Sequence, residues 1–233
     1  MPAHIFTEYD TALRAFRELI LAMAAQARQN LENAMCALMK RDTELAAGVL
    51  AADNDVDELE RKVDHHGMEL LLRFHPVASD LRSVIAGMKI STNLERISDH
   101  AVNIAKRARK LNRVSPRPEA QQLEPLYSAA YGILRDAMDA YTRHDPALGS
   151  VLAEKDREVD RLHKALIKEF GARMDEREVE AEVWLHLIFV CRSLERVADL
   201  AVNIGEEAVF LESAKDIRHE QRRNGGSPPP PQP

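Results

Sequence analysis

The feature that most constrains this chain is an internal repeat, in which two stretches a hundred residues apart are closely similar. Residues 93–104, Asn-Leu-Glu-Arg-Ile-Ser-Asp-His-Ala-Val-Asn-Ile, match residues 193–204 at eight of twelve positions. A second match has an offset of 103 residues and pairs Asp53 and Asp57 with Asp156 and Asp160. Two copies of one structural unit are the simplest explanation, and the fold must accommodate both of them.

Apolar residues follow alternating steps of three and four residues in six segments, which is the pattern of amphipathic helices. The segments are residues 13–34, 56–70 and 90–111 in the first copy, and 126–141, 159–170 and 190–211 in the second. An all-β protein needs turn residues about every 8–12 positions. The chain has only nine Gly and eleven Pro, and five of the prolines lie in residues 228–233. We therefore predict an all-α fold of two tandem antiparallel three-helix bundles.

The boundaries of the two units follow from where these helical patterns stop. We predict a first three-helix repeat over residues 1–113 and a second over residues 123–213. Residues 114–122 contain Pro116 and Pro118 among polar residues and are interpreted as the linker. Residues 214–233 are polar and then rich in proline, so we expect a disordered tail that buries no core.

The charge and cysteine content limit the compartment and the partners. The formal net charge is −6, whereas a protein built to bind nucleic acid is usually basic, so no nucleic-acid partner is expected. Cys36 and Cys191 lie in separate helical segments without metal-binding spacing, which suits reduced thiols in a cytoplasmic protein. No apolar stretch has the length of a transmembrane helix, so contact with a membrane is expected only through partners.

Each copy carries two acidic pairs spaced four residues apart, which places both acids of a pair on one helix face. The Asp53–Asp57 and Glu95–Asp99 pairs each centre about 21 residues from the break at Pro76, so they should stand at the same height on facing helices. The second copy repeats this arrangement. The eight candidate metal ligands are Asp53, Asp57, Glu95, Asp99, Asp156, Asp160, Glu195 and Asp199.

Four ionised carboxylates beside a buried seam repel one another and require compensation. One solution is a set of salt bridges, for which Arg96 and Arg196 are the candidates. Another is a metal ion, because carboxylate oxygens suit hard cations and can bridge several of them. A third interpretation places the acids on solvated helix faces, where repulsion is small. The residues by themselves leave these three alternatives open.

These motifs resemble the PhoU family. The resemblance is carried by Leu-Glu-Arg-x-x-Asp-x-Ala-Val-Asn-Ile at residues 94–104, by its second copy at 194–204, and by Pro-Val-Ala-Ser-Asp-Leu-Arg at 76–82. The segment Ile-Arg-His at residues 217–219 is similar to the end of that family's sequences. The resemblance covers roughly residues 9–219.

The resemblance implies a fold, a set of ligands and a set of partners. PhoU proteins are tandem three-helix bundles, often dimeric, whose acidic motifs bind multinuclear metal clusters. The resemblance thus assigns the first four acids to one cluster and the last four to another. It implies divalent or trivalent metal ions, iron first, with zinc, manganese or magnesium as alternatives. It also implies two partners, namely the ATPase subunit of a phosphate ABC transporter and a membrane sensor histidine kinase.

The function predicted from the sequence is therefore regulation by binding and not catalysis. We expect a cytoplasmic, homodimeric protein that negatively regulates high-affinity phosphate uptake and phosphate-responsive two-component signalling. Two alternatives remain from other functional classes. One is a phosphoester hydrolase that uses a carboxylate-bridged multinuclear metal to activate water. The other is a helical scaffold without metal.

Overall fold

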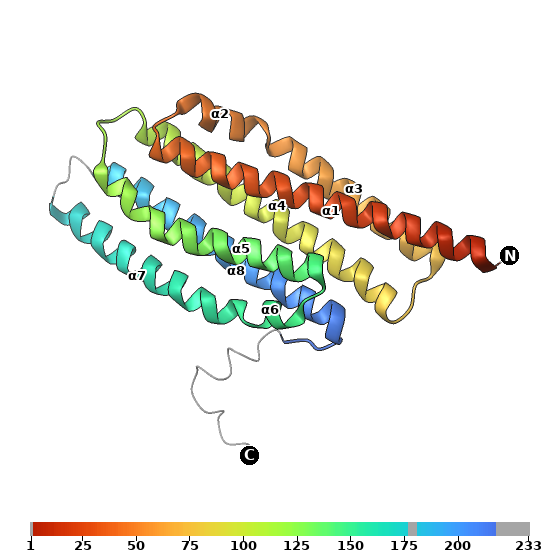
Figure 1. Cartoon of the computed structure of the whole chain (residues 1–233). Coiled ribbons are helices and arrows are strands. Elements are labelled where there is room, and N and C mark those ends of the chain that lie inside the picture. Colours follow the sequence, from red (N-terminus) through yellow and green to blue (C-terminus); the bar gives the residue numbers. More distant parts are fainter. Residues whose placement is uncertain (1, 177–180, 218–233) are drawn as a thin grey trace, which may run out of the picture.

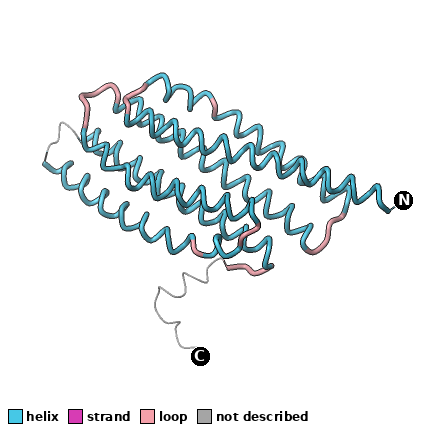
Figure 2. The backbone as a smooth tube through the Cα atoms, in the orientation of Figure 1, coloured by secondary structure: helices cyan, strands magenta, loops and turns pink. Residues whose placement is uncertain are grey.

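The computed structural model describes residues 2–176 and 181–217, with side chains for residues 7–174 and 181–217. All regular secondary structure in these residues is helical, so the predicted all-α class is confirmed (Figure 2). The elements are α1 (Pro2–Met39), α2 (Thr43–Ala51), α3 (Asp53–Phe74), α4 (Ser79–Leu111), η1 (Pro118–Leu123), α5 (Glu124–Arg143), α6 (Pro146–Ser150), α7 (Leu152–Glu176) and α8 (Ala181–Ser213).

The long helices form two antiparallel three-helix units that lie against each other (Figure 1). The first unit packs α1, α3 and α4 together, and the second packs α5, α7 and α8. The apolar segments found in the sequence supply the core: Phe16, Ile90, Val159 and Val190 are all fully buried. The helices align because each buries one apolar stripe against its two neighbours. In the described ranges, no helix is both long and apolar enough to cross a membrane.

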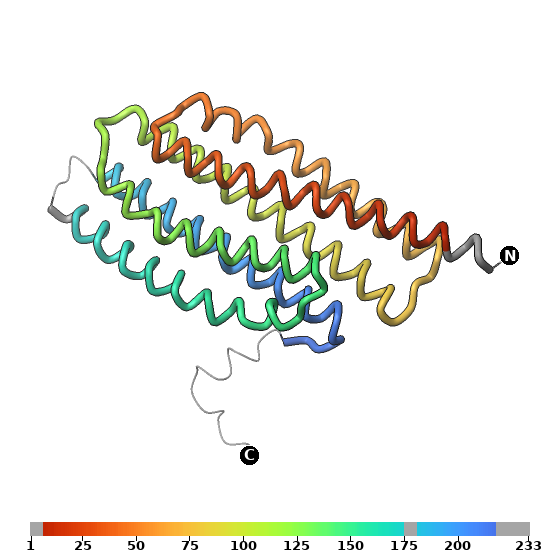
Figure 3. Tube along the Cα trace, viewed as in Figure 1, coloured from red at the N-terminus to blue at the C-terminus, as the bar shows by residue number. Residues whose placement is uncertain are grey.

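Helices α4 and α8 form the interface between the two units and run antiparallel along their whole lengths (Figure 3). Contacts toward both ends of α4 define this register. They join Arg82 Nε to the carbonyl of Leu211 at 3.1 Å, Lys89 Nζ to Glu207 Oε1 at 3.1 Å, and Arg107 Nη1 to His186 Nδ1 at 3.4 Å. The two repeats are thus related by the pairing of their equivalent third helices.

Both units interrupt the chain between their first two long helices in the same way. Arg41 and His144 adopt left-handed backbone conformations with φ of 58° and 54°. Asp42 and Asp145 follow and cap short helices, accepting backbone N–H bonds from residues three positions later at 2.9 and 3.0 Å. These short helices, α2 and α6, were not predicted, because each is too brief to show a helical period. Likewise, part of the predicted linker forms the 3₁₀ helix η1.

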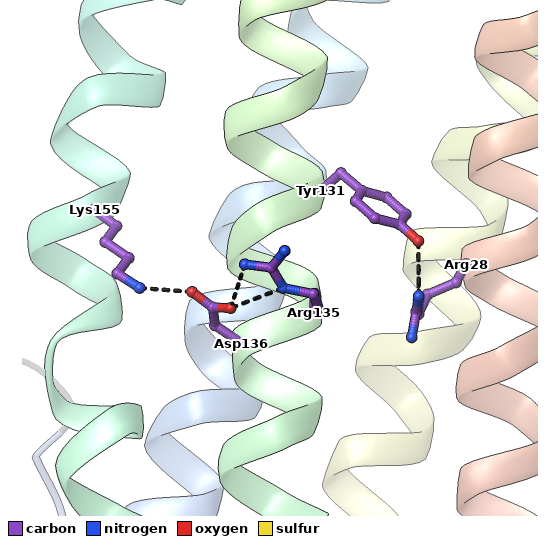
Figure 4. Close-up of polar contacts among 5 residues, drawn as sticks. All are labelled: Arg28, Tyr131, Arg135, Asp136 and Lys155. Carbon is purple, nitrogen blue, oxygen red and sulfur yellow. Dashed lines mark hydrogen bonds and ion pairs between the residues drawn. The ribbon is translucent and has the colours of Figure 1, made fainter.

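Two polar contacts tie α5 to its neighbours from opposite sides (Figure 4). On one side, Arg28 of α1 donates from Nη2 to the hydroxyl of Tyr131 at 2.8 Å, and this hydroxyl in turn donates to Glu32. On the other side, Lys155 of α7 lies 2.6 Å from the carboxylate of Asp136. The first contact links the two units, and the second is internal to the second unit.

The predicted disordered tail falls mostly outside the described residues. Residues 214–217 follow α8 without helical structure, and residues 218–233 lie beyond the described part of the chain. The described part of α7 extends to Glu176. Residues 177–180, between α7 and α8, are also outside the described ranges.

Candidate metal centres

The first acidic cluster lies where the beginning of α3 faces the middle of α4. Asp53 and Asp57 belong to the first two turns of α3, and Glu95 and Asp99 lie on α4 beside its buried stripe. Asp53, Asp57 and Glu95 are half-buried, whereas Asp99 is exposed. Their charges act on one another: Asp99 and Asp57 raise the pKa of Asp53, after burial itself. The structure therefore brings all four predicted residues of this cluster together.

Among the acids of this cluster, Glu95 has the most strongly raised pKa. Burial raises its pKa to about 7, and Asp99, Glu60, Asp57 and Asp53 add to the rise, in that order. A carboxyl group with such a pKa is partly protonated near neutral pH, because its charged form lacks compensation. The cluster thus carries more negative charge than the protein alone neutralises.

Glu60 is a member of this cluster that the sequence analysis missed. It lies on α3, one turn beyond Asp57, and is half-buried. Burial and the charges of Asp64, Asp57 and Asp99 raise its pKa, against an opposing hydrogen bond with Thr92. Its spacing of three residues from Asp57 is visible in the sequence, but it is not part of a repeated acidic pair spaced four residues apart.

The second cluster repeats the arrangement on α7 and α8. Burial raises the pKa of Asp156 to about 6, and Asp199, Asp160 and Glu195 contribute to the rise. Burial and Asp199 also raise the pKa of Glu195, while Arg196 and His163 lower it. All four of the predicted acids in this cluster are half-buried. The structure brings these four residues together as it does their equivalents in the first unit.

The two clusters differ in how far basic side chains compensate them. In the second, Arg196 donates from Nη1 to Asp199 at 3.0 Å, and Lys164 lies 3.3 Å from Asp160. In the first, none of the four predicted acids forms an ion pair with any residue that the structure describes. Internal salt bridges therefore compensate part of the negative charge of the second cluster, through Arg196 as expected. They do not compensate the first cluster, where Arg96 has no acidic partner in the described residues.

His163 is the second residue that the sequence analysis missed. It occupies the position in α7 that Glu60 occupies in α3, at the same offset of 103 residues that relates the aspartates. Its Nε2 atom is buried and lacks a hydrogen-bond partner within the described ranges. A buried imidazole nitrogen beside carboxylates is a good donor for a transition metal. The first cluster is thus made of oxygen donors, whereas the second also offers one nitrogen.

The donor chemistry of both clusters fits a metal ion, although the side chains are not yet arranged around one. Across residues 2–176 and 181–217, no three His, Cys, Asp or Glu side chains converge closely enough to hold a metal. Binding would require the carboxylates to change rotamer, which costs little for half-exposed side chains. A cation would then relieve the repulsion that raises the pKa of Glu95 and Asp156.

Comparisons with known proteins agree with the repeat. The family model described as "PhoU domain" matches twice, at residues 20–108 and 123–208. A Xylella fastidiosa protein named "Phosphate-specific transport system accessory protein PhoU homolog" is 34% identical over 208 residues, covering 89% of this chain and 88% of that protein. A protein of the same name from Pseudomonas aeruginosa is 33% identical over 217 residues, covering 93% and 90%.

Two solved structures share the fold. The crystal structure of PhoU from Pseudomonas aeruginosa superposes with a TM-score of 0.85 at 32% identity, over 89% of this chain and 100% of that one. The crystal structure described as the phosphate transport system regulatory protein PhoU from Streptococcus pneumoniae gives 0.81 at 27% identity, over 89% and 98%.

Proposed function

The chain belongs to the PhoU family, and we propose that it is a metal-binding accessory protein that restrains high-affinity phosphate uptake. One observation carries the proposal. Half-buried, incompletely neutralised acidic clusters occur at equivalent places in both repeats of a fold whose relatives are named as phosphate transport accessory and regulatory proteins.

The eight predicted acids would hold the metal ions, with Glu60 added in the first unit and His163 in the second. The ions would supply positive charge and link α3 to α4 and α7 to α8, because each cluster draws on both helices. Iron is our first choice, and zinc, manganese or magnesium are alternatives, because all accept carboxylate ligands. With its acids neutralised, each face would present a fixed surface to a partner.

The partners we propose are the ATPase subunit of a phosphate ABC transporter and a membrane sensor histidine kinase. The protein would act in the cytoplasm as a homodimer and reach the membrane through these partners. When phosphate is plentiful, it would hold the transporter inactive and keep the kinase in its repressing state. No reaction on a substrate is required for this role.

Metal content tests the proposal directly. Protein purified without chelators is measured by elemental analysis, together with the variants Asp57→Asn/Glu95→Gln and Asp160→Asn/Glu195→Gln. The control Asp55→Asn/Glu154→Gln changes exposed acids of the same two helices, α3 and α7, and keeps the same net charge as each variant. We expect each cluster variant to lose the metal of its own unit and the control to retain both. Equal, negligible metal in all four proteins would support the metal-free scaffold instead.

The regulatory role needs its own measurement. In cells that lack their own copy of the protein, uptake of labelled phosphate is followed under plentiful phosphate with each variant supplied. We expect the wild type and the control to restrain uptake and the cluster variants to release it. Unchanged uptake with the wild type would contradict the regulatory role even if metal were bound.

A third assay distinguishes the hydrolase alternative from the regulator. Metal-loaded protein is assayed on p-nitrophenyl phosphate, with Asp99→Asn as the comparison. We expect no turnover above the rate of free metal. Turnover that Asp99→Asn abolishes would replace the regulator with an enzyme.

A further inference from the structure

The last three turns of α4 carry a concentration of positive charge in an otherwise acidic protein. Residues 100–118 contain no Asp or Glu, although the whole chain has a net charge of −6. Asn103, Lys106, Lys110 and Arg113 follow one another in steps of three, four and three residues, and all four are exposed. This spacing places Asn103, Lys106 and Lys110 in a single stripe along one face of the helix, and Arg113 follows just beyond the helix end.

The stripe borders a surface groove of about 400 Å³. Its lining consists of one amide and five cationic side chains, namely Asn103, Lys106, Arg107, Arg109, Lys110 and Arg113. Within the ranges that the structure describes, Lys106, Lys110 and Arg113 form no ion pair with a carboxylate. We call these six residues the basic groove.

The fold itself does not require this charge, and the second repeat provides the control. At the same offset of 100 residues, the equivalent end of α8 carries Glu206 and Glu207 in place of Lys106 and Arg107. Further along, Phe210 and Ser213 replace Lys110 and Arg113. The same helix end is therefore built without a basic stripe in one repeat and with one in the other.

Stabilisation of the helix end does not explain the groove either. Cations near a helix C-terminus do interact favourably with the helix dipole. At the end of α4, however, Arg41 already donates hydrogen bonds to the carbonyls of Leu111, Asn112 and Val114. Lys110 lies in the last turn of α4 and Arg113 beyond its C-cap, yet both side chains are exposed and neither forms an ion pair with a described carboxylate. Lys106 lies a full turn before Lys110, where the helix dipole has little effect. A ligand is therefore the better reason for the three exposed cations.

We propose that the basic groove binds a small condensed phosphate, that is, an oxyanion with several negative charges such as tripolyphosphate. Lysine and arginine are the side chains that recognise phosphate oxygens, by charge and by paired N–H donors. The stripe from Lys106 to Arg113 spans about 10 Å at the helical rise. This length suits a chain of phosphates better than a single one.

The lining also argues against an acidic protein segment as the occupant. Protein interfaces bury an apolar core inside a polar rim. The basic groove offers no apolar side chain among its lining residues. A compact, highly charged ion is therefore the ligand whose chemistry the groove matches. This inference goes beyond the proposed function. It uses no acidic residue of the two clusters, and of the groove residues Lys106 also acts on the first cluster, where its charge lowers the pKa of Asp53 against the larger effect of burial.

The test is isothermal titration calorimetry of tripolyphosphate into the full chain, after metal has been removed with a chelator and the chelator dialysed away. The groove variant is Lys106→Gln/Lys110→Gln/Arg113→Gln. The control, Arg14→Gln/Lys168→Gln/Lys215→Gln, removes three exposed cations elsewhere and changes the net charge equally. Thermal unfolding of both variants shows whether they remain folded, and Lys106→Arg/Lys110→Arg/Arg113→Lys preserves the charge of the groove.

We expect saturable binding to the wild type, the control and the charge-preserving variant, and affinity at least about tenfold weaker in the groove variant. We also expect the affinity to fall as salt is added, because the pairs are exposed to solvent. Equal affinity in the groove variant and the control would overturn the proposal. Absence of tripolyphosphate binding to the wild type would overturn it as well. Binding to phosphatidylglycerol vesicles that the groove variant loses, without tripolyphosphate binding, would instead identify a lipid headgroup as the ligand and would also overturn the proposal.

Discussion

Lys89 of α4 holds the carboxylate of Glu207 of α8 between the two repeats, with Nζ 3.1 Å from Oε1 and 3.3 Å from Oε2. The side chain of Glu207 is only 7% exposed, whereas that of Lys89 is 39% exposed. The pair therefore joins the two units through a buried acid whose charge is balanced from the other unit. The interface between equivalent helices is polar at this point and apolar around it.

Lys89→Met should destabilise the protein. The variant removes the Lys89 ammonium from the buried Glu207 carboxylate, and we expect a loss of about 2 kcal/mol in the free energy of unfolding, between the values for surface and buried pairs. Urea denaturation measures this loss. The control Lys62→Met removes an exposed pair with Glu58, whose side chains are 51% and 59% exposed, and should cost clearly less, because water screens an exposed pair. Equal losses in the two variants would contradict the structural role of the Lys89–Glu207 pair.

Gly87→Ala should disturb the packing of α4 on α1. A Cβ atom at Gly87 would lie 2.4 Å from Cε1 of Phe16, which is fully buried. The ring must move, and we expect a loss of about 1–3 kcal/mol in the free energy of unfolding.

Gly132→Ala is the matched control for this change. A Cβ atom at Gly132 in α5 meets nothing within 4 Å. Alanine should therefore stabilise that helix by about 0.5–1 kcal/mol through its higher helix propensity. Thermal or urea unfolding of both variants provides the comparison, and a stabilising Gly87→Ala would refute the close approach of α4 and α1.

Glu95 should make the metal-free protein less stable as the pH rises. Its pKa is raised from 4.5 to about 7 in the folded protein, mainly by burial. Between these values the folded protein keeps a proton that the unfolded chain releases, so the free energy of unfolding falls as the pH increases. The full loss is present above about pH 7.

Urea denaturation across this pH range checks the expectation. Glu95→Gln should flatten the decline, because glutamine does not titrate, whereas the exposed control Glu44→Gln should leave it unchanged. If the wild type and Glu95→Gln showed the same pH profile, the electrostatic description of the first cluster would be wrong.

Glu60 in the first unit and His163 in the second occupy equivalent positions, and this difference should give the two units different metal preferences. This prediction depends on the proposed metal binding. Zinc accepts imidazole nitrogen readily, whereas magnesium and manganese favour oxygen donors. We therefore expect His163→Glu to weaken zinc retention in the second unit by about tenfold or more, with little effect on manganese.

Competition with a chelating dye, in a protein whose first cluster carries Asp57→Asn/Glu95→Gln, isolates the second unit for this measurement. His163→Gln serves as the comparison, because it removes the nitrogen donor without adding a carboxylate. Unchanged zinc retention in both His163 variants would exclude the imidazole from the site.

Much of the architecture could be predicted from the sequence, because the period of a helix appears directly in the spacing of its apolar residues. The three- and four-residue steps in residues 13–34 and 190–211 predicted which face of each helix is buried, and the repeat related the two units. The short connection around Pro76 made α3 and α4 antiparallel neighbours, which brought Asp53 and Asp57 opposite Glu95 and Asp99. Local periodicity and a short loop were sufficient for these conclusions.

Contacts between distant segments were decided only by the tertiary structure. Periodicity shows that α4 and α8 each have an apolar stripe, but it does not say that they pack on each other or place Lys89 beside Glu207. The positions of Glu60 and His163 and the exposure of the basic groove likewise depend on which side chains neighbouring helices cover. A repeating pattern in one helix specifies its buried face, whereas the partner of that face depends on the packing of the whole bundle.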